Sequence, residues 1–149
     1  MSHKENAARQ LAQYQSELFR KSTRFDIIGS LTQTSQESYS IGSMTSMIFS
    51  WGERGDQYIN RGPFKNSFEW LSARLDLAIR DEDRILASTD VEDDIEDAQN
   101  AKYIARRLIT MLPTISDPNV VEPTTLFHQD MHSRKVLVDQ SGNITALLD

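Results

Sequence analysis

Two histidines and an aspartate alternate near the carboxyl end of the sequence, at His128, Asp130 and His132. An extended backbone would place all three side chains on one side, because successive side chains of a strand point to opposite faces. Imidazole and carboxylate groups at such spacing could bind a transition metal. Alternatively, His128 packs in the fold and orients the loop through hydrogen bonds, and Asp130 caps nearby backbone amides in a turn. The triplet alone leaves these interpretations open.

The residues that follow place the triplet in a longer pattern. Residues 136–139 and 144–148 are mostly apolar and predict two short strands, and the turn-forming residues 141–143 lie between them. A second aspartate, Asp149, comes directly after the second predicted strand. The combination of triplet, strand, turn, strand and aspartate is a more specific signal than His-x-Asp alone.

This pattern resembles a kinase-type catalytic loop, in particular that of the aminoglycoside phosphotransferase and choline kinase-like enzymes. Loops of that family typically read His-x-Asp-x-x-x-x-Asn, and a hairpin separates them from a metal-binding aspartate. Residues 25–31, 49–52 and 61–64 are also similar to segments that recur in fungal members of the family. The resemblance therefore extends over most of the chain.

The resemblance implies transfer of the γ-phosphoryl group of ATP to a hydroxyl of a small-molecule acceptor, with ATP and Mg²⁺ as cofactors. In such a reaction Asp130 is the base that accepts the proton of the hydroxyl. His128 takes the place of the histidine that mainly has a structural role in the loop. Asp149 takes the place of the aspartate that binds magnesium.

Lys135 departs from the family pattern at the position five residues after Asp130, where the family has asparagine. A carboxamide oxygen is a suitable ligand for magnesium, whereas an ammonium group has no lone pair to donate. Lys135 would repel a metal ion there, although its charge could replace part of the ion's charge by contacting phosphate directly. We expect Lys135 at the cofactor-binding position and impaired catalysis.

The sequence covers only part of the family pattern. No segment before residue 25 resembles the glycine-rich loop and lysine strand that contact the ATP phosphates in full-length relatives, and the sequence stops at Asp149. We therefore expect one partial kinase-like domain over residues 1–149, truncated at both ends, with weak or no activity. The alternatives are a non-catalytic remnant that serves as a binding module, and an incomplete gene model.

The elements expected around the loop give an α+β fold rather than alternating βαβ units. We expect a partial protein kinase-like fold, mostly the helical carboxy-terminal lobe with a catalytic-loop β-hairpin, whose amino-terminal lobe is absent. Periodicity predicts three helices and an early hairpin, and the stretch from 50 to 64 has no clear period. The predicted helices cover residues 4–21, 66–85 and 95–112, and the predicted strands 25–31, 39–44 and 124–128.

Local signals refine these elements. Asn66, three residues before Glu69, marks a helix start, and Pro113 is expected to end the third helix. The acidic residues 90–97 predict a solvated loop and a helix start, where carboxylates meet the positive end of the helix dipole. Four aromatic residues are expected to pack in the core or the substrate lobe. They are Trp51, Phe64, Trp70 and Tyr103.

Composition limits the classes of function and compartment. The net charge of -6 argues against broad contact with a nucleic-acid backbone. No apolar run approaches the ~20 residues that cross a bilayer, and residues 1–6 lack the apolar core of a secretory signal. The absence of cysteine is compatible with a reducing compartment, so we expect a cytoplasmic protein that contacts neither nucleic acid nor membrane.

Overall fold

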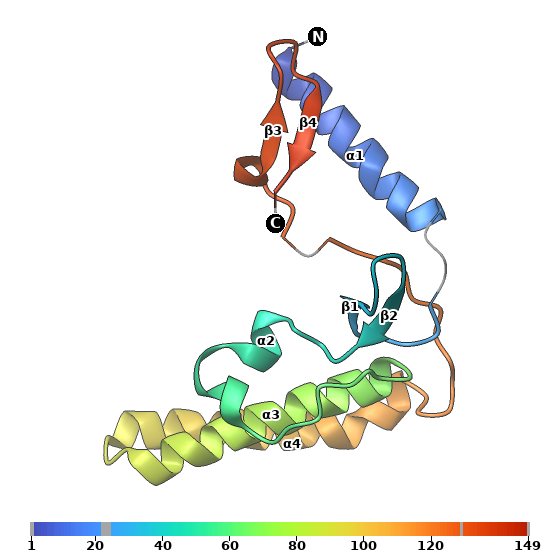
Figure 1. Cartoon of the computed structure of the whole chain (residues 1–149). Helices are drawn as coiled ribbons and strands as arrows, with labels where there is room; N and C mark the ends of the chain where they lie inside the picture. The colour runs from blue at the N-terminus through green and yellow to red at the C-terminus, as the bar shows by residue number, and fades with distance from the viewer. Residues whose placement is uncertain (1, 22–24, 129, 149) are drawn as a thin grey trace. The chain divides into compact units, whose positions relative to one another are not determined.

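The computed structural model describes residues 2–21, 25–128 and 130–148. Helices dominate, and two small antiparallel sheets complete a mixed α+β structure, as the sequence predicted (Figure 1). The chain divides into two compact units, Asp26–Pro123 and a second unit made of Met1–Phe25 and Thr124–Asp149.

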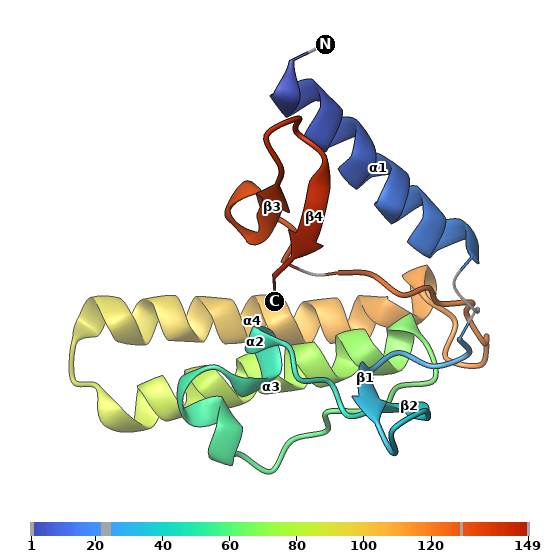
Figure 2. The same cartoon turned by 45° about the horizontal axis from the view of Figure 1, so that its top comes forward.

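Two long helices form the body of the unit Asp26–Pro123. α3 (Ser67–Ser88) and α4 (Glu92–Ile115) lie antiparallel and side by side in both views (Figures 1 and 2). α4 buries small or apolar side chains every seven residues, which keeps one face of the helix against its neighbour. These buried residues are Ala98, Ala105 and Leu112.

A small apolar core lies between α3 and the segments that precede it. Phe49 and Phe64 are fully buried there, with ring centroids 6.0 Å apart, and Leu77 of α3 packs in the same cluster. Phe49 comes from α2 (Met47–Ser50), a single helical turn. Phe64 is held in place by a backbone bridge to Ile28, in which each residue donates an N–H to the other.

The early hairpin of this unit consists of β1 (Ser30–Gln33) and β2 (Tyr39–Gly42), which pair antiparallel as predicted. After α2 the chain forms a short 3-10 helix, η1 (Gly52–Asp56). Arg54 fixes η1, since its guanidinium donates to Asp81 of α3 at 2.8 Å and to the carbonyl of Ile48 at 2.8 Å. A charged group with several hydrogen bonds therefore takes the place of apolar packing here.

Asn66 connects the start of α3 to the segment that follows α4. Its side-chain oxygen accepts the Glu69 N–H at 3.0 Å, which confirms the predicted helix cap. Its amide group donates to the carbonyls of Pro118 and Val120 at 2.9 and 3.0 Å, and the residue is 2% exposed. The buried carboxamide of Asn66 therefore joins the start of α3 to the segment that follows α4.

The other unit places helix α1 (His3–Lys21) beside a hairpin of β3 (Val136–Val138) and β4 (Ile144–Leu147), as both views show (Figures 1 and 2). Gln10 of α1 donates to the carbonyl of Gly142 at 3.3 Å and accepts the Ile144 N–H at 3.1 Å. The Gln10 side chain therefore bonds α1 to backbone atoms of the hairpin turn.

Gly142 makes this close approach possible. Its φ of 78° lies in the region that favours glycine, and a Cβ at this position would meet the backbone of His3 at 2.8 Å. Asp139 stabilises the same turn, because its carboxylate accepts the N–H groups of Ser141 and Asn143, each at 2.8 Å. The turn at 141–143 and the two flanking strands were predicted correctly.

Four predictions of secondary structure were wrong. The first strand was predicted over residues 25–31, but β1 begins at Ser30, and Phe25 and Ile28 form only isolated bridges before it. Pro113 was predicted to end the third helix, but it lies inside α4, near the end of the helix. The helix continues past it, and the Ser116 N–H donates to the Leu112 carbonyl at 2.9 Å. Residues 124–128 form no strand, since only Thr124 pairs, in an isolated bridge with Phe25. The region 50–64 was predicted to be irregular, yet it includes η1 and the end of α2.

The start of α4 agrees with the expectation for the acidic residues 90–97. Glu92, Asp93 and Asp94 occupy the first turn of α4, where the sequence placed a helix start. Within the parts of the chain that the structure describes, no helix combines the length and apolar character needed to cross a membrane.

Replacing Asn66 by alanine tests whether its hydrogen bonds stabilise the helical pair. Asn66→Ala removes a helix cap and the donor to the carbonyls of Pro118 and Val120, so we expect the free energy of unfolding to fall by about 1–3 kcal/mol. Chemical denaturation of Asn66→Ala and of Asn100→Ala, an exposed position in α4, measures the difference. Equal stability of the two variants would contradict the assigned role.

Candidate functional site

The predicted site residues lie on the segment that enters the β3–β4 hairpin. After His132 the chain forms a short 3-10 helix, η2 (Ser133–Lys135), which leads directly into β3. Lys135 is held at both backbone groups, because its N–H donates to the His132 carbonyl at 2.9 Å and its carbonyl accepts the Leu148 N–H at 2.8 Å. The hairpin therefore fixes the backbone from which the Lys135 side chain extends.

Asp130 and Lys135 form the main contact of the site. The Lys135 Nζ lies 2.6 Å from Asp130 Oδ2, with side-chain exposures of 25% and 60% respectively. His132 Nε2 lies 3.7 Å from the other oxygen, Asp130 Oδ1. Lys135, predicted to lie at a cofactor-binding position, thus pairs with the carboxylate predicted to be the base, a contact that the sequence did not predict.

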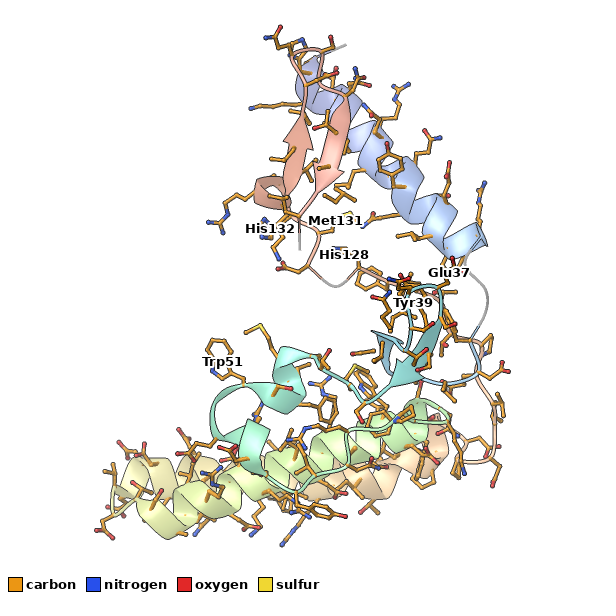
Figure 3. All side chains as sticks on the ribbon, viewed as in Figure 1. Glu37, Tyr39, Trp51, His128, Met131 and His132 are labelled. Carbon is orange, nitrogen blue, oxygen red and sulfur yellow. The ribbon has the colours of Figure 1, made fainter. Side chains whose placement is uncertain are left out.

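The two histidines of the loop make local contacts with the backbone. His128 Nδ1 accepts the Asp130 N–H at 3.3 Å, and His132 Nδ1 accepts the Arg134 N–H at 3.2 Å. Each contact joins two residues that are two positions apart in the sequence. Figure 3 shows His128 and His132 on the two sides of this loop, with Met131 between them. The histidines shape the loop around Asp130.

The electrostatics of the loop favour ionised Asp130. A hydrogen bond from Lys135 is the main reason that the pKa of the Asp130 carboxyl lies below its ordinary value. Partial desolvation opposes this effect, and electrostatic interactions with Lys135, His132 and His128 add to it. Because a carboxylate with a lowered pKa holds a proton less strongly, Asp130 is a weaker base in this arrangement than a free aspartate.

The described residues do not fit a metal ion at this site. Among them, no three His, Cys, Asp or Glu side chains gather in a metal-binding arrangement. Asp130 supplies a single carboxylate, and the ammonium of Lys135 occupies the space beside it. Asp149, the predicted magnesium ligand, lies outside the described residues. The transition-metal interpretation and the magnesium site therefore stay predictions.

No protein-family model, curated protein or solved structure matches the chain. The kinase-like interpretation therefore rests on the sequence pattern and on the chemistry of the loop.

Two of the four aromatic residues expected to pack are exposed instead. Phe64 is buried in the core and Trp70 packs against it, as predicted, but Trp51 and Tyr103 are 67% and 60% exposed. Trp51 follows a single helical turn and precedes Gly52, whose φ is 58°, so it lies at the junction between α2 and η1. That glycine was the available signal that Trp51 would face outward.

Removing the charge of Lys135 should raise the pKa of Asp130. In Lys135→Met the carboxylate loses its main hydrogen-bond donor and a nearby positive charge, so protonated Asp130 becomes more favourable. An NMR pH titration of the side-chain carboxyl carbon measures this shift. Arg134→Met, which removes an exposed cation one residue away, serves as the control and should have a much smaller effect. An unchanged pKa in Lys135→Met would contradict the contact.

Proposed function

We propose that this chain carries the catalytic loop of a kinase-like small-molecule phosphotransferase of the aminoglycoside phosphotransferase and choline kinase-like type. The parent activity is transfer of the γ-phosphoryl group of ATP to a hydroxyl of a small molecule. In this proposal the helical unit and the hairpin correspond to parts of the carboxy-terminal lobe of a kinase-like fold. A reducing compartment such as the cytoplasm suits a chain without cysteine.

One observation carries the proposal. An exposed carboxylate, Asp130, stands five residues before Lys135, which directly precedes the hairpin strand β3, and the Lys135 ammonium lies 2.6 Å from it. The carboxylate is thus accessible to a hydroxyl, and a fixed positive charge lies at the position where the family pattern has a metal ligand.

The chemistry that these two side chains can perform is limited. Asp130 can accept the proton of an acceptor hydroxyl as that oxygen attacks phosphorus. Lys135 can contact a phosphate oxygen as a point charge. Its ammonium must then either break its contact with the Asp130 carboxylate or contact both groups at once. The same ion pair that keeps Asp130 ionised also lowers its proton affinity. We therefore propose that phosphoryl transfer by this chain is weak.

A second candidate function is a non-catalytic binding module, and the same ion pair favours it. With its charge compensated by Lys135, Asp130 acts as a structural residue of the loop rather than as a base. Lys135 then contributes to binding an anionic group without any transfer step. The two candidates differ in whether Asp130→Asn abolishes a measurable reaction.

Restoring the family residue should increase magnesium-dependent nucleotide binding. In Lys135→Asn the ammonium is replaced by a carboxamide oxygen, so we expect at least about tenfold tighter binding of ATP in the presence of Mg²⁺ than for the unaltered chain. Calorimetric titration with ATP, with and without Mg²⁺, measures this change. Arg134→Asn makes the same replacement one residue earlier and should leave binding unchanged.

The outcomes separate the two candidates. Phosphate release or transfer by Lys135→Asn that disappears in Lys135→Asn/Asp130→Asn supports the phosphotransferase. Magnesium-independent ATP binding that needs Lys135, without turnover in any variant, supports the binding module. If Lys135→Asn and the unaltered chain both fail to bind ATP, the kinase-like proposal is wrong.

A further inference from the structure

A groove lies along one side of the unit Asp26–Pro123, far along the sequence from the loop of Asp130. It has a volume of about 1000 Å³ and runs between α3 and the α2–η1 segment. The α3 wall comes from positions at helical spacing, Ala78, Asp81, Glu82, Ile85 and Ser88, which occupy one face of the helix.

The opposite wall carries large apolar side chains beside the charged residues Glu53 and Arg54. Met47 and Trp51 line it and are 62% and 67% exposed, and Ile85 across the groove is 40% exposed. Figure 3 shows Trp51 projecting from the chain just after α2. Large apolar side chains around a concavity, together with a few polar groups, are typical of small-molecule sites.

Two ion pairs form among the charged side chains of the groove, and Glu82 takes part in neither of them. Arg54 neutralises Asp81, with its Nη2 2.6 Å from Asp81 Oδ2, and Arg84 pairs with Glu53. Glu82 pairs with no cation in the part of the chain that the structure describes. Desolvation, and then the charge of Asp81, raise the pKa of Glu82 above its ordinary value. The groove thus has one carboxylate that lacks a counter-ion.

We propose that this groove binds a small amphiphilic cation, an apolar body that carries one ammonium group, with the ammonium at Glu82 and the apolar body against Trp51, Met47 and Ile85.

The charge and shape of the groove select this class of ligand. An anion would meet the uncompensated carboxylate, and a neutral apolar molecule would leave it without a partner in a partly desolvated place. A single positive charge satisfies Glu82 and can also interact with the face of the Trp51 ring. The volume lies at the upper end of the roughly 300–1000 Å³ range of small-molecule pockets. One unpaired charge beside one cluster of apolar side chains matches a single small ligand rather than a long protein segment.

The probe is 4-phenylbutylamine, compared with 4-phenylbutanol and 4-phenylbutanoate, which keep the apolar body and change only the charged end. Calorimetry should give a dissociation constant about tenfold lower for the amine than for the alcohol, and weaker binding still for the carboxylate. Binding should also shift the emission of Trp51 to shorter wavelength. Trp51→Phe should abolish that shift, since Trp70 lies against the core rather than in the groove.

Two charge-matched variants locate the cation. Glu82→Gln should remove the preference for the amine over the alcohol, whereas Glu96→Gln, an exposed glutamate of α4 outside the groove, should keep it. Glu82→Gln is expected to fold, because it removes a carboxylate that burial and Asp81 disfavour. Circular dichroism and the melting temperature check this.

Three results would overturn the proposal. They are equal affinity for the amine and the alcohol, equal loss of amine binding in Glu82→Gln and Glu96→Gln, and absence of binding by all three probes. Concentration-dependent dimerisation that Trp51→Phe abolishes and that the amine cannot compete with would assign the groove to a second copy of the chain instead. All of these readouts are independent of Asp130 and Lys135, so they do not depend on the proposed phosphotransferase function.

Discussion

The buried carboxamide of Asn66 is the contact on which the helical unit depends. It begins α3 through the Glu69 N–H and holds the segment after α4 through two carbonyls, so one side chain joins three parts of the chain. The apolar core beside it is small, centred on Phe49 and Phe64. With few buried apolar groups, hydrogen bonds from a few polar side chains must fix the geometry, because each would be costly to leave unsatisfied.

The same arrangement recurs at both proposed sites. Arg54 bonds η1 to α3, which builds one wall of the groove, and Gln10 bonds α1 to the turn that supports the loop of Lys135. Function then depends on which charge remains without a partner. In the loop, Lys135 compensates Asp130 and weakens it as a base, whereas in the groove Glu82 keeps an uncompensated charge that a cationic ligand can satisfy.

The helix cap at Asn66 was predicted from the sequence, whereas the helical turns α2 and η1 and the contact of Lys135 with Asp130 were not. The Asn66 cap depends on Glu69 three residues later, so the start of α3 was predicted correctly. Pro113 was predicted to end the helix, but α4 continues past it to Ile115. α2 and η1 are too short to show a period, and the contact of Arg54 with α3 makes them regular. The contact of Lys135 with Asp130 was missed because loop curvature, not residue type, brings them together.

We propose that the charge of Lys135 takes the place of a metal ion beside Asp130. The most direct test is a manganese titration followed by NMR relaxation of the backbone amides of residues 130–135, in the unaltered chain and in Lys135→Asn. Mn²⁺ broadens signals close to its binding site. We expect strong broadening of these amides in Lys135→Asn, and little broadening in the unaltered chain at the same concentration of Mn²⁺. Equal broadening in both proteins would contradict it.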